Sequence, residues 1–295
     1  MNIAALVRIL VLVSLGLIVL SLGLRGNRGD AAYLFHRPRL LLRSLLTMNV
    51  VMPIFAIWLV VLLDLRPAVK VALVVLSVSP VAPFFPGKAL KLTQRQGYIY
   101  GLLVASAALA VILVPISTRV LSYLALSGLP VAGRRVLEVV APTILVPFAL
   151  GAIVRRLIPE SSERLARICG LIGNVVLLVA VVLILIGQAA PMAALLGDGT
   201  LVAIAVYTCV GLLVGHLLGG PDAQDRTVLA LATVTRHPAV ALAAAAAVFP
   251  VQSQAPAAIL LALIVSVLAA APYVVWRRKH ADHDTRNEGG SLQHP

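Results

Sequence analysis

Two short stretches of the sequence interrupt long apolar runs with residues that could bind or carry a charge. The first reads Ser79-Pro80-Val-Ala-Pro83-Phe-Phe-Pro86, and the second reads Thr233-Val-Thr235-Arg236-His237-Pro238. Arginine offers a planar fork of donors that fits a carboxylate, and histidine changes its charge near neutral pH. The two stretches are therefore candidates for an anion-binding site.

Arg236 is the most informative residue of the second stretch. It is ninth in the apolar run 228–249, so it would lie about 12–14 Å from the end of a helix. Burial of an arginine at that depth costs roughly 3 kcal/mol in a membrane. The acids within or beside the apolar runs, Asp64, Glu138, Asp198 and Asp225, all lie near their ends. Two interpretations remain open: an anionic substrate pairs with Arg236, or carbonyls freed at the first interruption satisfy it.

Several further residues are candidate substrate ligands. His237 is either a proton carrier or a hydrogen-bonded packing residue. Small polar side chains could bind substrate or one another, and Lys88 is either a second cation at the site or a topology signal. The candidate substrate-binding set is Arg236, His237, Thr235, Thr233, Ser79, Asn49 and Lys88.

Four prolines are expected to break helices at these stretches. Proline lacks an N–H and clashes with the carbonyl four residues back, so it ends or kinks an α-helix. Broken backbone within a membrane is tolerated only where it is buried in protein or lines a wet cavity. The helix-breaking residues are Pro80, Pro83, Pro86 and Pro238.

The composition places these stretches in a membrane. Of 295 residues, 61% are apolar and 12% charged, with a mean hydropathy of +1.03. Apolar blocks near 20 residues long can each cross a bilayer as a helix. A soluble globule, a coiled coil and a disordered chain are excluded. We predict an all-α polytopic protein, with one transmembrane domain over 1–276 and a disordered cytoplasmic tail over 277–295. Nine spans are expected, at about 3–24, 40–63, 68–86, 97–118, 137–154, 168–188, 199–218, 228–249 and 256–276.

Basic residues predict how these spans are oriented. Seventeen of the 24 lysines and arginines lie in the loops after odd-numbered spans, at the edge of span two or in the tail, and five lie on the opposite side. The positive-inside rule then places the N-terminus outside and the C-terminus in the cytoplasm of a cell membrane.

The two interruptions fall in corresponding spans. They lie in the third and eighth spans, five crossings apart, so the two spans traverse the membrane in opposite directions. Inverted-topology repeats have this arrangement, and their discontinuous helices mark the substrate site near the midplane. We expect two broken helices in corresponding positions of the two repeats, at the substrate site.

Three motifs in order resemble the bile acid:sodium symporter superfamily, in a nine-span form. They are Asn49-Val-Val-Met52-Pro53, Ser79-Pro80 at the first break, and Pro238-Ala-Val-Ala-Leu-Ala in span eight. The resemblance covers about residues 3–276. It implies a panel domain, a core domain in which the broken helices cross, and secondary transport of organic anions, commonly driven by sodium.

The sequence departs from this family at the residues that bind sodium. The resemblance places the family's sodium-binding Ser-Asn pair on Phe85 and Pro86, its Glu on Ala232 and its Gln on Arg236. Sodium is a hard cation that prefers oxygen ligands. These residues supply no such side-chain oxygens, so the usual sodium sites are expected to be lost. Sodium, a proton or no coupling ion all remain open, and His237 is the local candidate for coupling to a proton.

The functional expectation is a secondary transporter of a small organic anion that works by alternating access within the lipid bilayer. The alternative is a membrane receptor or assembly protein that retains the fold without transport. Enzyme motifs such as HExxH and GxSxG are missing, and no histidine spacing suggests a metal site. We expect no enzymatic activity, no cofactor and no nucleic-acid partner.

Overall fold

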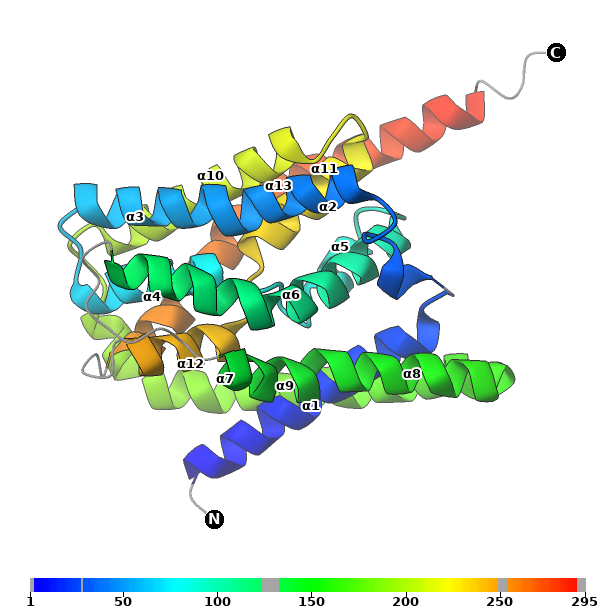
Figure 1. Cartoon of the computed structure of the whole chain (residues 1–295), viewed down its shortest axis with the longest axis horizontal. Helices are drawn as coiled ribbons and strands as arrows, with labels where there is room; N and C mark the ends of the chain where they lie inside the picture. Colours follow the sequence, from blue (N-terminus) through cyan, green and yellow to red (C-terminus); the bar gives the residue numbers. More distant parts are fainter. Residues whose placement is uncertain (1–2, 28, 124–132, 249–253, 291–295) are drawn as a thin grey trace.

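The computed structural model describes residues 3–27, 29–123, 133–248 and 254–290, which form an all-helical bundle. In Figure 1, α1 begins below the bundle and α13 extends out of it at the upper right. The elements are α1 (Ile3–Arg25), η1 (Asp30–Ala32), α2 (Pro38–Leu46), η2 (Thr47–Val51), α3 (Met52–Leu62), α4 (Pro67–Val78), α5 (Phe85–Ala89), α6 (Gln96–Tyr123), α7 (Gly133–Val140), η3 (Ala141–Leu145), α8 (Val146–Leu157), α9 (Pro159–Ala194), α10 (Thr200–Leu218), α11 (Ala223–Val234), α12 (Pro238–Val248) and α13 (Ala255–Gly290).

Two of the long helical segments each contain one π-helical turn. η2 joins α2 to α3, and η3 joins α7 to α8. Pro53 and Pro147 follow these turns and cannot donate a helical hydrogen bond, which accounts for the change of winding. The sequence predicts kinks at these prolines, and the structure has π-turns there, a form that often marks functional positions.

The helices fit a protein that crosses a membrane several times. Six helices of the described ranges are long and apolar enough to span a bilayer, and Ile9–Arg25 and Pro67–Val78 are shorter apolar helices. The chain is thus an all-α polytopic membrane protein. The count of nine spans and their orientation remain predictions.

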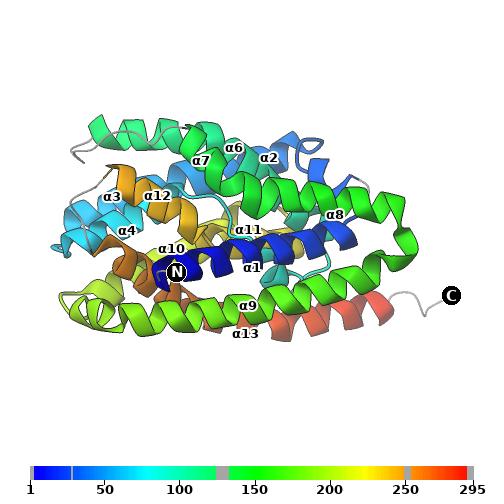
Figure 2. The same ribbon diagram turned by 90° about the horizontal axis from the view of Figure 1, so that it is seen from below.

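A first group of helices, which we call the panel, consists of α1, α8 and α9. Figure 2 shows α1 between the other two helices, and α1 has its most extensive contacts with them. Glycines allow this close approach: a Cβ on Gly23 would lie 2.3 Å from the carbonyl oxygen of Phe148, and one on Gly151 would lie 2.4 Å from that of Leu20. Small residues at such crossings are typical of membrane helix pairs.

The remaining helices form a second group, the core, which includes α4, α5, α11 and α12 (Figure 1). Within it α10 and α11 pack tightly because Gly211 and Gly215 of α10 and Gly219, which caps its end, recur every four residues on one face. A Cβ on Gly215 would lie 2.6 Å from the Cα atom of Ala230. The backbones of the two helices therefore touch at this glycine.

We expect Gly215→Ala to destabilise the protein, although alanine is normally the better helix former. The added methyl group meets the backbone of α11, which cannot rotate away, and such overpacking typically costs about 1–3 kcal/mol. Gly187→Ala in α9 is the matched control, since its Cβ would meet nothing within 4 Å. Thermal unfolding in detergent should show opposite signs for the two variants, and equal midpoints would contradict the close contact.

The last helix, α13, runs to Gly290 and so extends into the range 277–295, for which the sequence predicts a disordered tail. Arg277 is buried and donates to the carbonyl of Ala223 at 3.3 Å, and its guanidinium lies 5.4 Å from the ring centroid of Trp276. These contacts hold the first turn of the expected tail against α11.

Candidate functional site

The two interrupted spans cross as broken helices in the core. α4 ends at Val78 and α5 begins at Phe85, while α11 ends at Val234 and α12 begins at Pro238. The extended segments between them form an antiparallel β-bridge between Val81 and Arg236. Ala82 N donates to Thr235 O at 3.0 Å, and His237 N donates to Pro80 O at 2.8 Å. The predicted crossing of two discontinuous helices is confirmed.

The four helix-breaking prolines have different positions in this crossing. Pro80 and Pro83 lie in the non-helical segment after α4, whereas Pro86 lies in the first turn of α5 and Pro238 is the first residue of α12. Proline is well suited to the first turn of a helix, because its fixed φ is helical. The N–H groups of that turn have no acceptor within the helix, so the N–H that proline lacks costs no hydrogen bond there. Two prolines thus interrupt the spans, and two restart them.

Arg236 lies at the centre of the crossing, with only 1% of its surface exposed. Its Nε donates to Thr233 O at 2.8 Å, one terminal nitrogen donates to Ser79 O at 2.9 Å, and the other donates to Met48 O at 2.9 Å. The three carbonyls belong to η2 and to the two breaks. Of the two interpretations of Arg236, this structure has the one in which freed carbonyls satisfy the guanidinium.

These carbonyls are available because the local backbone is not regular α-helix. The last carbonyls of a helix have no intrahelical donor, and Thr233 and Ser79 lie at the ends of α11 and α4. Met48 lies within the π-turn η2. Arg236 therefore joins three separate segments through main-chain oxygens, which are also the ligands that hard cations prefer.

His237 lies where the crossing meets the helices that lead into the panel. Its side chain is fully buried, and its Nε2 lies 3.2 Å from Thr143 Oγ1 in η3, just before α8. Its Nδ1 is buried without a hydrogen-bond partner in the described structure. One ring nitrogen thus contacts the panel side, and the other is available for a further group.

The candidate hydroxyls are already bonded within their own helices. Ser79 Oγ donates to Val75 O at 2.7 Å, and Thr233 Oγ1 donates to Leu229 O at 2.7 Å. Thr235 is buried and contributes its carbonyl to the crossing. These three residues hold the crossing through their main chain.

The other two candidates differ in their distance from the crossing. Asn49 lies half-buried in η2, next to Met48. Lys88 is exposed on α5, and its Nζ lies 5.2 Å from the ring centroid of Phe84. The structure thus places Asn49 beside the crossing and Lys88 outside it.

Some residues of the site were not identified from the sequence. Thr143 contacts His237, and Ser106 Oγ accepts a hydrogen bond from Val81 N at 3.3 Å. Tyr207 has a buried hydroxyl that finds no hydrogen-bond partner among the described residues. The prolines on both sides of Thr143 are a sequence signal for this position, because they interrupt the regular α-helix and produce the π-turn η3. Ser106 and Tyr207 carry no comparable signal in the sequence.

Residues 12–195, more than half of the chain, match the sequence profile of the Sodium Bile acid symporter family. The chain belongs to this family. No curated protein matches the chain. Membership in the Sodium Bile acid symporter family makes the chain a member of a family of membrane transporters. The matched range includes the first break and ends before the second, so Arg236 and His237 lie outside it.

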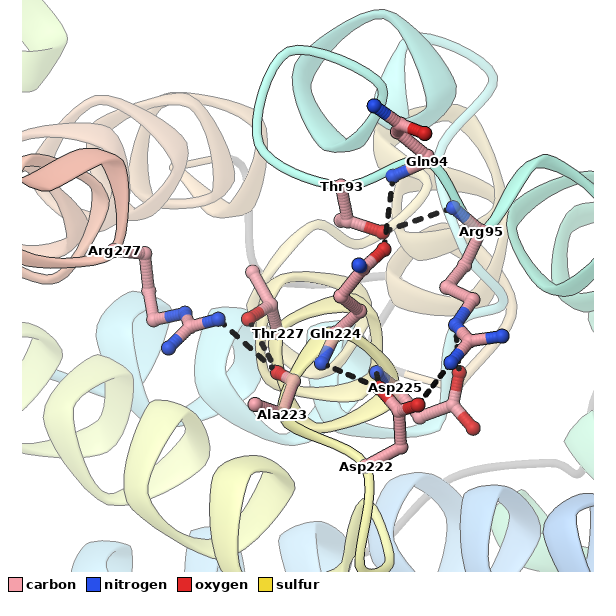
Figure 3. A network of polar contacts seen from close by, with 9 residues as sticks. All are labelled: Thr93, Gln94, Arg95, Asp222, Ala223, Gln224, Asp225, Thr227 and Arg277. Atoms are coloured by element: carbon pink, nitrogen blue, oxygen red, sulfur yellow. Dashed lines mark hydrogen bonds and ion pairs between the residues drawn. The ribbon is translucent and has the colours of Figure 1, made fainter. Parts of the chain in front are cut away.

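A polar network ties the two broken helices of this symporter-family fold together at one end of the core (Figure 3). Asp222 caps α11 by accepting hydrogen bonds from Gln224 N and Asp225 N. Arg95 pairs with both Asp222 and Asp225. Gln94 N donates to Gln224 Oε1 at 3.1 Å. The chain that follows α5 is thereby fixed to the start of α11.

Asp225 is the most perturbed acid of this network. Burial and then the charge of Asp222 raise the pKa of the Asp225 carboxyl above its ordinary value, against the opposing effects of Arg95 and Arg37. The paired arginine therefore offsets only part of the cost of an ionised Asp225.

Asp222→Ala is expected to lower the stability of the protein by about 1 kcal/mol, because it removes a helix cap. Asp222→Asn keeps a capping oxygen and loses the charge, so it should retain most of that stability. Chemical unfolding of both variants measures the difference. Equal losses would mean that the ion pair, and not the cap, stabilises this end of α11.

Proposed function

We propose that the protein is a secondary transporter of a small organic anion, in which Arg236 replaces a coupling cation at the crossing of the broken helices. The position of Arg236 among three main-chain carbonyls is the observation that supports the proposal most directly. Substrate would bind between core and panel. The N-terminus would lie outside the cell membrane and the C-terminus in the cytoplasm.

The crossing supports this assignment through the direction of its helix dipoles. In discontinuous transporter helices, C-terminal ends and unwound carbonyls bind cations, and N-terminal ends face anionic groups. Arg236 neutralises the C-terminal ends of α4 and α11. The N-terminus of α12 then retains its partial positive charge for an anion.

His237 defines where that anion would lie. It immediately precedes α12, its unpaired Nδ1 is buried, and its Nε2 contacts Thr143. An imidazole Nδ1–H beside a helix N-terminus would bind a carboxylate oxygen. A proton is the candidate coupling ion, since the His237 imidazole can gain or lose a proton near neutral pH.

Movement of the core against the panel would expose the anion position at His237 to each side of the membrane in turn. The panel helix α9 connects to the core helix α10 through Gly197, Asp198 and Gly199, which have φ values of 118°, 43° and 72°. Positive φ is readily adopted by glycine and is costly for other residues. This short connection is the kind of joint that alternating access requires.

Counterflow in proteoliposomes tests the proposal. Purified protein would be loaded with a steroid acid, a keto acid or another monocarboxylate, and uptake of the labelled compound measured. We expect one class to exchange, and His237→Phe to reduce its apparent affinity about tenfold or more, since a hydrogen bond to a charged group contributes about 1.5–3 kcal/mol.

His216→Phe is the matched control. His216 lies on α10 and pairs with Tyr273 instead of the crossing, with its Nδ1 2.9 Å from the Tyr273 hydroxyl. This variant should transport with unchanged affinity. Absence of counterflow for every anion would support a non-transporting receptor, and equal effects of both histidine variants would remove His237 from the binding site.

A further inference from the structure

A cavity of about 290 Å³ lies where α1 and α8 end and α9 begins, away from the crossing. Its lining combines apolar and basic residues: Phe148, Ala152 and Pro159 are apolar, and Arg155 and Arg156 are adjacent cations in the last turn of α8. No acidic residue lines the cavity within the described part of the chain. The cavity is thus suited to an anion that also carries an apolar portion.

The two arginines have different environments. Arg155 is half-buried, and its terminal nitrogens donate to Leu24 O at 3.1 Å and to Asn27 Oδ1 at 3.5 Å. These bonds orient its guanidinium against the end of α1. Arg156 is exposed. One cation is therefore preorganised in the wall, and the second can close over a bound group.

Neither Arg155 nor Arg156 forms an ion pair within the described part of the chain. Glu163 pairs with Arg25 at 3.8 Å, and the Oδ2 atom of the buried Asp30 accepts a hydrogen bond from Asn27 N at 2.7 Å. The positive charge of Arg155 and Arg156 is available for an external anion.

The position of the cavity relative to the membrane indicates which kind of anion it binds. Leu150, Ile153 and Leu157 on α8 are at least 49% exposed, as expected of side chains that face lipid tails. Arg155 and Arg156 follow on the same helix, and its end would lie at the cytoplasmic surface in the predicted orientation. Basic pockets between membrane helices on that side are suited to anionic lipid headgroups.

We propose that this cavity binds the phosphate of an anionic phospholipid headgroup, with Arg155 and Arg156 as its ligands and with the adjoining apolar wall against the start of the acyl chains. The cavity belongs to the panel and to the turn that leads from α1 towards η1. A bound lipid would hold the panel at the membrane surface while the core moves. The site is independent of the substrate position proposed at His237.

Binding of phosphatidylglycerol tests the site directly. The protein would be placed in nanodiscs of phosphatidylcholine with an increasing fraction of phosphatidylglycerol, and bound lipid counted by native mass spectrometry after release. Arg155→Gln/Arg156→Gln should weaken retention about 30-fold, because each basic residue near a membrane surface contributes about one kcal/mol. Arg164→Gln/Arg167→Gln on α9 is the matched control, since it removes two exposed cations outside the cavity.

Two additional variants separate the cavity from general electrostatic attraction. Ala152→Leu keeps both charges and fills part of the cavity, so it should also lose the bound lipid. Arg156→Gln alone leaves the Arg155 bonds intact and should weaken retention about fivefold, which preserves the test if the double variant fails to fold.

Three outcomes would overturn the proposal. Equal losses in the α9 control would show only general attraction to the bilayer. Equal retention of phosphatidylcholine would show no headgroup selectivity. Full displacement of lipid by millimolar inorganic phosphate would assign the cavity to a free phosphate group instead of a phospholipid.

Discussion

Arg236→Met is expected to lower the free energy of unfolding by about 3 kcal/mol or more. Methionine fills a similar volume but leaves the carbonyls of Met48, Ser79 and Thr233 buried without donors. Each buried unsatisfied group costs about 1–3 kcal/mol. Methionine also avoids the cost of burying a charge, and this gain offsets part of the lost stability. Thermal or denaturant unfolding in detergent measures the difference.

Arg278→Met is the control, because Arg278 is exposed in the second half of α13. Arg236→Lys should recover little of the stability, since an ammonium on a shorter stem cannot reach three carbonyls from separate segments. Arg236→Ala leaves a space for the missing group, and tens of millimolar guanidinium should raise its melting temperature selectively. An Arg236→Met variant as stable as the wild type would contradict a stabilising role of these bonds.

The broken helices could be predicted because their cause is local. Proline removes a donor and clashes with the preceding turn wherever it occurs in a helix. The segments around Pro80 and Pro238 therefore reveal their breaks without any knowledge of tertiary structure. Their crossing is implied by the resemblance to the symporter family, in whose core domain two broken helices cross, and not by the prolines alone.

The partners of Arg236 could not be predicted, because main-chain carbonyls carry no sequence identity. Every residue has one, and only the tertiary fold brings Met48 and Ser79 to the guanidinium. The same limit applies to Thr143, one of many small polar residues on apolar helices, which becomes notable only through its contact with His237. Contacts between distant segments depend on packing that residue types alone do not specify.

The contact between α10 and α11 leaves a signal in the sequence. Gly211, Gly215 and Gly219 repeat every four residues, a pattern that allows close helix contact in membranes. The pattern identifies the contacting face of α10, although it does not name α11 as the partner. Lys88 shows the converse case, in which a cation near a break in the sequence lies outside the crossing.

Transport is expected to be independent of sodium, in contrast to sodium-driven symport. Phe85 and Ala232 are fully buried and have no side-chain oxygen to bind a cation. The carbonyls at the crossing already accept hydrogen bonds from Arg236. A sodium ion about 5 Å from that guanidinium would be repelled by about 3 kcal/mol at an effective dielectric constant near 20. That repulsion alone corresponds to an affinity more than about 100-fold weaker.

Uptake of the transported anion into proteoliposomes should therefore be the same in sodium, potassium and choline buffers. Sodium should also leave the melting temperature of the wild type unchanged. In Arg236→Ala the freed carbonyls of Ser79, Met48 and Thr233 become available to a small cation, so sodium should stabilise this variant more than choline does. Saturable stimulation of wild-type uptake by millimolar sodium would place a cation site elsewhere in the core and would remove Arg236 from its role as the substitute cation.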